Sequence, residues 1–233
     1  MIRALQGTSL IEFPGKISTV LFSAGCNLTC PFCHNPELVN VSFLDKELGL
    51  SFDKVISELQ AREGFIDAVV LTGGEPLLYQ VNIILLKRIK NETELAIKLD
   101  TNGTYPIRLK EALKYVDMVA MDLKASPKNY YKATGGRAQF DDVKESANLL
   151  INQSDVSYEF RSTMVPGFIT AEDVLILINE FAPRRIKRYA LQAFRSGKTL
   201  SKELLNTPSY PKGYIEALAE QIVPLVDDVQ LRI

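Results

Sequence analysis

The chain of 233 residues contains only one histidine and three cysteines. A single histidine leaves little scope for paired acid–base catalysis or for a serine–histidine–aspartate triad. Three cysteines crowded into eight residues make a poor disulfide framework. These scarcities exclude the common hydrolytic and disulfide-stabilised classes, and they leave a metal framework as the more natural use of the cysteines.

The chain also lacks an excess of positive charge and a long apolar run. Lys and Arg number 27 against 28 Asp and Glu, for a net charge of −1, so the basic field typical of nucleic-acid binding is missing. No apolar run approaches the ~18 residues of a membrane helix. Gly7, Glu12 and Pro14 interrupt the stretch that a signal peptide needs. We therefore expect a soluble, cytoplasmic protein that binds neither membrane nor nucleic acid. The local basic run is expected to be the solvated entrance to a strand and comprises Arg184, Arg185, Lys187 and Arg188.

Apolar runs of strand character alternate with helical patterns along the whole chain. The expected strands are 17–22, 68–71, 95–99, 116–121, 157–165, 189–192 and 229–233. The expected helices are 52–62, 81–90, 107–115, 141–151 and 171–181, with Ser51 and Thr170 as N-terminal caps of the first and last. About six repeated units with short connections predict a parallel α/β sheet with right-handed crossovers. We expect an open partial (β/α)6 barrel, with a doubly wound sheet as the alternative.

The same pattern predicts one domain over residues 1–233. Its core covers about 15–195, and a C-terminal helix and strand follow within 211–233. In parallel barrels the chemistry lies at the C-terminal ends of the strands. The distinctive loops fall there: GCNLTCPFCHN, TGGEP, DTNG, DLK and PGF follow five successive strands. Their convergence on one rim predicts a binding site.

The cysteine loop places Cys26, Cys30 and Cys33 in a Cys-x3-Cys-x2-Cys pattern. Thiolates suit iron–sulfur clusters or zinc. A 4Fe–4S cluster held by three cysteines keeps one iron open to a substrate, as an open position makes a zinc site catalytic. One alternative is a zinc ion bound by the three cysteines and His34, in a binding module that is stabilised by zinc or carries electrons. For His34 itself, the alternative is that it only orders the loop.

This loop, with Phe32 before its last cysteine, resembles the signature of radical S-adenosylmethionine (SAM) enzymes. The segment 9–39, SLIEFPGKISTVLFSAGCNLTCPFCHNPELV, is similar to the activating proteins of glycyl radical enzymes, and most to that of anaerobic ribonucleoside-triphosphate reductase. The resemblance covers about 9–195 and itself implies a partial (β/α)6 barrel. It also implies one 4Fe–4S cluster on Cys26, Cys30 and Cys33, whose open iron chelates SAM.

The resemblance implies further SAM contacts, which the motifs match residue by residue. The GGEP and DTNG loops, the D-x-K stretch and an Arg-led segment carry most of them. The implied SAM contacts are Phe32, His34, Gly73, Gly74, Glu75, Pro76, Asp100, Thr101, Asp122, Leu123, Lys124 and Arg161. Gln192 could bond the ribose, because the chain departs here from a histidine that related proteins often carry. A monovalent cation is implied near Asp100 and Asp122, and Glu12 could meet the substrate's glycine loop.

Several of these residues also have ordinary structural interpretations. GGEP could be a plain strand-to-helix turn, and Asp100 could close its strand in an Asx-turn. Arg161 could form an ordinary ion pair, and Glu12 could be a surface glutamate.

The activity that the resemblance implies begins when flavodoxin or ferredoxin reduces the cluster by one electron. SAM is then cleaved, and the 5′-deoxyadenosyl radical removes a Cα hydrogen from a glycine of the partner enzyme. The cofactor performs the chemistry, while the protein orients it and excludes water. Pyruvate formate-lyase or another glycyl radical enzyme is the alternative partner.

Overall fold

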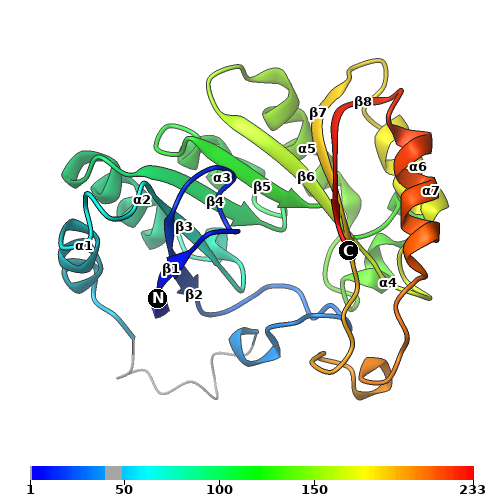
Figure 1. Ribbon diagram of the computed structural model, residues 1–233, viewed down its shortest axis with the longest axis horizontal. Helices are drawn as coiled ribbons and strands as arrows, with labels where there is room; N and C mark the ends of the chain where they lie inside the picture. The colour runs from blue at the N-terminus through cyan, green and yellow to red at the C-terminus, as the bar shows by residue number, and fades with distance from the viewer. Residues whose placement is uncertain (1, 40–48) are drawn as a thin grey trace.

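The fold is an eight-stranded sheet whose strands follow one another in sequence order, in a computed structural model that describes residues 2–39 and 49–233 (Figure 1). The strands are β1 (Ile2–Ser9), β2 (Ser18–Ser23), β3 (Ala68–Gly73), β4 (Ala96–Thr101), β5 (Met118–Asp122), β6 (Ser157–Met164), β7 (Ile186–Ala193) and β8 (Val226–Arg232). The helices are α1 (Phe52–Gln60), α2 (Val81–Glu92), α3 (Pro106–Ala112), α4 (Pro127–Ala133), α5 (Phe140–Asn152), α6 (Ala171–Asn179) and α7 (Lys212–Ile222). Short 3-10 turns occupy η1 (Pro36–Leu38), η4 (Pro76–Leu78) and η5 (Lys202–Leu204).

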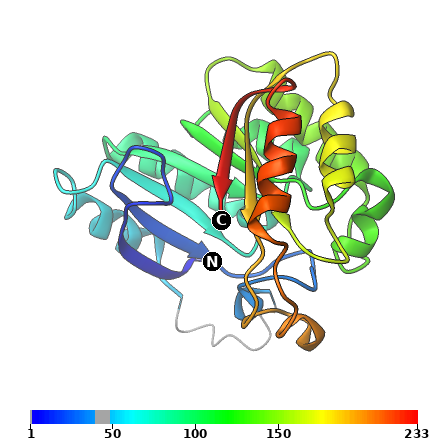
Figure 2. The same cartoon turned by 45° about the vertical axis from the view of Figure 1, so that its right-hand side comes forward.

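The sheet is parallel from β2 to β8, and only β1 pairs antiparallel, with β2. Strands β1 and β8 form its two edges, so the barrel is not closed. The helices cover the outer, convex side of the curved sheet (Figures 1 and 2). This confirms the open partial barrel. The doubly wound alternative is wrong, because such a sheet reverses its strand order and this one does not.

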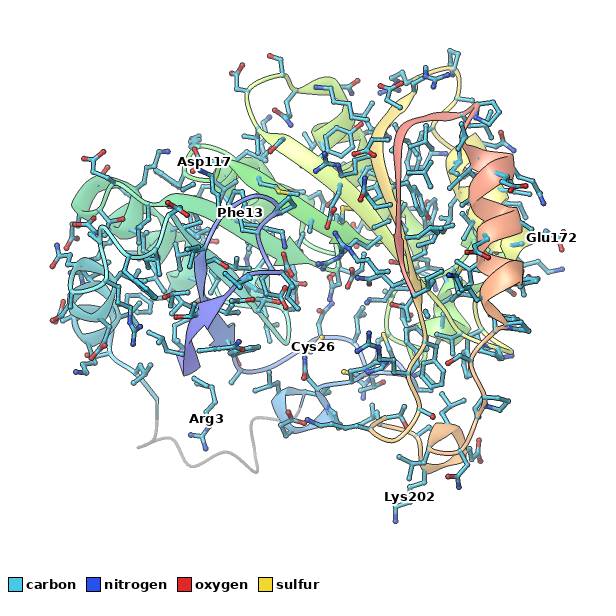
Figure 3. All side chains as sticks on the ribbon, in the orientation of Figure 1. Arg3, Phe13, Cys26, Asp117, Glu172 and Lys202 are labelled. Carbon is cyan, nitrogen blue, oxygen red and sulfur yellow. The ribbon has the colours of Figure 1, made fainter. Side chains whose placement is uncertain are left out.

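Both faces of the sheet are covered, which explains why its strands form continuous apolar runs. Leu71, Ile97 and Val119 pack in the large core under the helices. On the inner face, Val20, Val70 and Met118 form a smaller cluster with Phe13. Phe13 lies in the segment that joins β1 to β2, and it packs over this inner face (Figure 3). The barrel interior is therefore apolar toward the N-terminal ends of the strands, beneath the site that is predicted at their C-terminal ends.

The predicted elements agree with the structure to within a few residues, apart from two omissions. Strand β1 was not expected, because its burial alternates as in an edge strand and it contains no continuous apolar run. Helix α4 was not expected either, since it spans only seven residues. The expected C-terminal helix and strand are α7 and β8.

Two predicted helix caps are confirmed. The Ser51 hydroxyl accepts a hydrogen bond from the backbone N–H of Lys54 at 3.2 Å. Thr170 and Asp173 form a capping box at the start of α6. Both caps satisfy N–H groups that the first helical turn leaves without partners.

The basic run lies at the start of β7, where the sequence placed a strand entrance. Arg185 and Arg188 pair with Asp227 and Asp228 of the neighbouring strand β8, each at 2.6 Å. Within the described part of the chain, no helix is long and apolar enough to span a membrane.

Candidate active site

The loops at the C-terminal ends of the strands surround a cavity of about 740 Å³ that extends into the barrel. Cys26 lies near the centre of the view, at the C-terminal ends of the strands. Asp117 lies at the opposite end of the sheet (Figure 3). The predicted site residues that line the cavity are Glu12, Cys26, Cys30, Phe32, Cys33, His34, Gly73, Gly74, Asp100, Thr101, Asp122, Lys124, Arg161 and Gln192. Glu75, Pro76 and Leu123 are buried outside this lining. The structure thus brings four of the five predicted loops, the segment after β7 and the β1–β2 connection to one cavity, whereas the PGF loop does not line it and β6 contributes Arg161 and Thr163 from the strand itself.

Segments remote in sequence hold the cysteine loop in place. Thr29 N–H donates to the carbonyl of Thr134 at 3.3 Å, and Ser201 N–H donates to the carbonyl of Pro31 at 2.8 Å. Within the loop, Cys33 N–H donates to the carbonyl of Cys30 at 3.0 Å. The loop and the segment that follows β7 run side by side in both views (Figures 1 and 2). The three thiols are therefore presented on a backbone that the fold has already ordered.

The cysteine thiols are buried or half-buried and are neutral without a metal. Burial raises the pKa of Cys26 to about 12 and that of Cys30 to about 11, and it also raises the pKa of Cys33. Leu28 N–H donates to the Cys26 sulfur at 3.4 Å. Metal binding would convert these soft donors to thiolates.

The three sulfurs fit an iron–sulfur cluster better than a single zinc ion. Among the described residues, no three His, Cys, Asp or Glu side chains are grouped to hold one metal ion. A tetrahedral zinc site needs its ligands around a single point, whereas a 4Fe–4S cluster takes one thiolate on each of several irons. The donor chemistry and its arrangement on one loop therefore suit a cluster.

His34 packs against the segment after β7. Its ring lies edge-on to Phe194, with centroids 5.7 Å apart. Burial lowers the pKa of His34, and the charges of Arg195 and Lys198 lower it further. Phe32 makes a similar edge contact with Phe168 at 5.8 Å.

The GGEP loop touches the end of β2 through its backbone. Gly74 N–H donates to the carbonyl of Ser23 at 2.8 Å, and Glu75 N–H donates to that of Gly25 at 2.7 Å. A Cβ on Gly74 would lie 2.1 Å from the Gly25 carbonyl oxygen, and Gly73 has a φ of +120°. Both positions therefore require glycine.

Glu75 holds two loops together from beneath the cavity. Its carboxylate accepts from Leu77 N–H at 2.9 Å, from the Thr101 hydroxyl at 2.8 Å and from Asn102 N–H at 2.7 Å. The side chain is fully buried, and burial raises the pKa of Glu75 to about 7. These bonds occupy the carboxylate and join the GGEP loop to the DTNG loop.

Asn102 connects the DTNG loop to the cysteine loop. Its amide donates to Asn27 Oδ1 at 3.0 Å and lies 3.9 Å from the Cys26 sulfur. Its own oxygen accepts from Thr104 N–H at 3.0 Å, which makes Asn102 the Asx-turn residue of this loop. Asn27 was missed as a site residue, although its place directly after Cys26 was a signal.

Two aspartates in the barrel are neutralised by cations of the chain itself. Arg161 bridges them, donating to Asp100 Oδ2 at 3.0 Å and to Asp122 Oδ1 at 2.8 Å. Lys98 bonds Asp100 Oδ1 at 2.6 Å, and Lys124 bonds Asp122 Oδ2 at 3.2 Å. Asp100 thus serves in a charge network and not in an Asx-turn, and Arg161 is the centre of that network.

The pKa values within this network follow from the ion pairs. Burial opposes ionisation of Asp100 and Asp122, but the charges and hydrogen bonds of Arg161 and of the paired lysine together outweigh it and hold both pKa values below their usual range. Burial would lower the pKa of Lys124, but Asp122 and the Cys30 sulfur raise it. All of these groups are therefore charged near neutral pH.

Lys98 is the network member that was not expected from the sequence. It lies in β4 with only 2% of its side chain exposed. A lysine within the apolar run LAIKLD was a usable signal, because a buried lysine is rare unless it is paired.

The remaining predicted residues lie at the margins of the cavity. Gln192 accepts from the Thr163 hydroxyl at 3.5 Å. Glu12 lines the cavity beside Ile11, a side chain that is 84% exposed. Arg232 Nη2 donates to both carboxylate oxygens of the buried Glu159, each at 2.9 Å.

Comparison with known proteins places the chain in a family. The model of the radical SAM superfamily matches residues 20–181. A protein of Methanocaldococcus jannaschii, whose name describes a glycyl-radical enzyme activating enzyme, is 28% identical over 240 residues, covering all of this chain and 95% of that protein. The pyruvate formate-lyase-activating enzyme of Clostridium pasteurianum is 31% identical over 178 residues, covering 74% of this chain and 71% of that enzyme.

Solved structures show the same fold at low sequence identity. SuiB of Streptococcus suis bound to S-adenosylmethionine matches with a TM-score of 0.68 and 17% identity, over 91% of this chain and 49% of SuiB. Coproporphyrinogen III oxidase of Escherichia coli matches with a TM-score of 0.61 and 13% identity, over 92% of this chain and 54% of that enzyme. The chain spans about half the length of these structures.

The chain belongs to the radical SAM superfamily. Within it, the chain is homologous to the activating enzymes of glycyl radical enzymes, which are radical SAM enzymes of oxidoreductase type that act on a protein substrate. Membership implies a 4Fe–4S cluster and SAM binding.

The close approach of Gly74 to β2 predicts a specific effect of added volume. We expect Gly74→Ala to lower the free energy of unfolding by about 1–3 kcal/mol, because its Cβ would displace the Gly25 backbone. It should also reduce the iron bound on reconstitution, since Gly25 directly precedes Cys26. Denaturant titration and iron analysis measure the two effects. Gly213→Ala is the control, because open space surrounds that position in α7; equal behaviour of the two variants would contradict the prediction.

The buried Glu75 carboxyl predicts a pH-dependent stability. Its pKa of about 7 in the folded protein lies above the usual 4.5, so its contribution is full below pH 4.5 and is lost as pH rises through 7. Relative to Glu75→Gln, the wild type should lose on the order of 2 kcal/mol of unfolding free energy between pH 5 and 8. Denaturant titration of both metal-free proteins tests this, with the exposed Glu145→Gln as control. A difference independent of pH would refute it.

Proposed function

We propose that this protein uses a 4Fe–4S cluster and SAM to place a glycyl radical on anaerobic ribonucleoside-triphosphate reductase. One observation carries the proposal: three thiols on one ordered loop open onto the cavity that also contains the charge network. The similarity of segment 9–39 to that activating protein supports this choice of partner. The match to the Methanocaldococcus jannaschii protein, which extends over the whole chain, supports the activating role.

We propose that Cys26, Cys30 and Cys33 hold the cluster and leave one iron without a protein ligand. With both bound, the cluster and SAM supply the radical that removes the glycine hydrogen. The buried position of Cys30 and the half-buried positions of the other two thiols keep water from much of this region.

The rest of the cavity would orient SAM. Lys124 would pair with the carboxylate of SAM, and the backbone carbonyls at Gly73 and Gly74 would accept from its ammonium. Glu75 would act on SAM indirectly, because its oxygens accept the hydrogen bonds that join the two loops.

The other proposed SAM contacts come from both sides of the cavity. The backbone from Phe32 to His34 would lie against the adenine, and Gln192 would bond the ribose. Thr101, with Pro76 and Leu123 behind the lining, would support these contacts. No separate monovalent cation is included, because Asp100 and Asp122 already pair with cations of the chain.

Glu12 would meet the partner's glycine loop at the open side of the barrel. Its carboxylate can accept backbone N–H groups from an extended segment. Flavodoxin or ferredoxin is the proposed electron donor. Residues 1–233 would act as one domain in the cytoplasm.

Pyruvate formate-lyase is the second candidate partner. The 31% identity to the Clostridium pasteurianum enzyme favours it. The two partners share the same chemistry at glycine, so the site itself accommodates either.

The ligand assignment predicts that Cys30→Ala loses the cluster. Anaerobic reconstitution of the wild type should give a brown protein with about four irons, and the variant should retain far less iron and no SAM cleavage. Iron analysis and 5′-deoxyadenosine assay measure these losses. Pro31→Ala is the control, because it keeps the carbonyl that bonds Ser201. Retained 5′-deoxyadenosine production by Cys30→Ala would overturn the assignment.

The partner is tested by mixing reduced, reconstituted protein and SAM with each candidate enzyme separately. We expect a glycyl radical signal in electron paramagnetic resonance with anaerobic ribonucleoside-triphosphate reductase, and a much weaker one with pyruvate formate-lyase. The reverse order would select the second candidate. A colourless protein that holds one zinc would instead support the binding module.

A further inference from the structure

Every carboxylate oxygen of Asp100 and Asp122 already accepts a hydrogen bond, and each carboxylate is paired with two cations of the chain. Lys98 occupies Asp100 Oδ1 at 2.6 Å, while Arg161 and the Thr72 hydroxyl occupy Oδ2 at 3.0 and 3.3 Å. Arg161 Nε and Lys124 occupy the two oxygens of Asp122 at 2.8 and 3.2 Å. A sodium or potassium ion beside Asp100 would be repelled by the positive charges of both Lys98 and Arg161. The residues therefore do not fit the monovalent cation that the resemblance implies here.

The network also carries the charge that such a cation would supply. The three cations Lys98, Arg161 and Lys124 face the two carboxylates, which leaves a formal surplus of one positive charge. The neighbouring Glu159 does not cancel this surplus, because Arg232 pairs with it through both oxygens. A ligand carboxylate entering the cavity would meet a site that is already positive.

Lys98 is the member that makes this surplus possible. It is 2% exposed, and it lies in register with Val70 and Met118 on the inner face of the sheet. In this apolar surrounding the Lys98 Nζ pairs with Asp100 Oδ1 at 2.6 Å. A lysine ammonium is a compact point charge with three donors, so it can take the electrostatic place of a small monovalent ion.

We propose that the Lys98 ammonium is a built-in cation that replaces the free monovalent cation at Asp100. SAM binding by this protein is then independent of potassium and sodium. The inference rests on the proposed function, because SAM is the ligand whose carboxylate the surplus charge receives. Lys98 is a positioning residue in this scheme, since it acts on SAM through Asp100, Arg161 and the charge of the network.

The first test needs only the wild-type protein. SAM affinity of the reconstituted enzyme is measured in potassium chloride and in choline chloride of equal ionic strength, because choline is too large to enter an ion site. We expect the two dissociation constants to agree within about twofold. A tenfold or greater loss in choline, restored by potassium, would overturn the inference while leaving the proposed function intact. Absence of SAM binding in both salts would instead count against the proposed function.

The second test removes the Lys98 ammonium, so that a free monovalent cation can bind at Asp100 in its place. Lys98→Met leaves Asp100 without its ammonium, and we expect SAM affinity in choline to fall about tenfold or more and to recover in part with potassium. Lys87→Met, on the exposed side of α2, should behave as the wild type in both salts. A Lys98→Met variant that binds SAM normally in choline would refute the role of Lys98.

A third measurement does not involve the cluster or SAM. Potassium should raise the melting temperature of cluster-free Lys98→Met, but not that of the cluster-free wild type. If Lys98→Met does not fold, the salt exchange on the wild type still decides the question.

Discussion

The backbone contact between the loop after β3 and the end of β2 is the constraint on which the site depends. Gly74 and Glu75 donate to carbonyls at Ser23 and Gly25, at distances that exclude any side chain on Gly74. Because Gly25 directly precedes Cys26, this contact positions the cysteine loop. Glu75 then extends the same unit to Asn102 by a buried hydrogen bond, which the low local dielectric strengthens. Hydrogen bonds thus join three loops from separate strands.

Inside the barrel, charged side chains of separate strands are likewise held together by ion pairs. Two buried carboxylates would be costly if they were unpaired, and Arg161 satisfies both with one planar guanidinium, whose fork suits two acceptors. Lys98 and Lys124 complete the pairs at either side. The chain thereby prepares a positive surface for an anionic group before any ligand arrives. Preorganised charge of this kind does not have to reorganise when the reaction begins.

Most of the fold could be predicted, because parallel strands buried on both faces form continuous apolar runs and connect in one hand. Ser51 and Thr170 were recognisable as caps from local pattern alone. Strand β1 was not, since an edge strand with alternating burial lacks the apolar run on which the prediction relied. The cysteines, GGEP and DTNG were identified as one site because each loop follows a strand end. Lys98 was overlooked, since it lies within a strand and carries no motif.

By itself, the sequence determined the succession of strands and helices along the chain, the spacing of the three thiols and the glycines that allow close backbone contact. These are local properties, set by residues within a few positions of one another. Only the tertiary structure decided where the charged side chains point. Glu75 bonds a residue 27 positions away, and Arg161 reaches Asp100 across 61 positions. Such partners become neighbours only when the strands pair in the sheet, where β3 lies beside β4 and β5 alone separates β4 from β6.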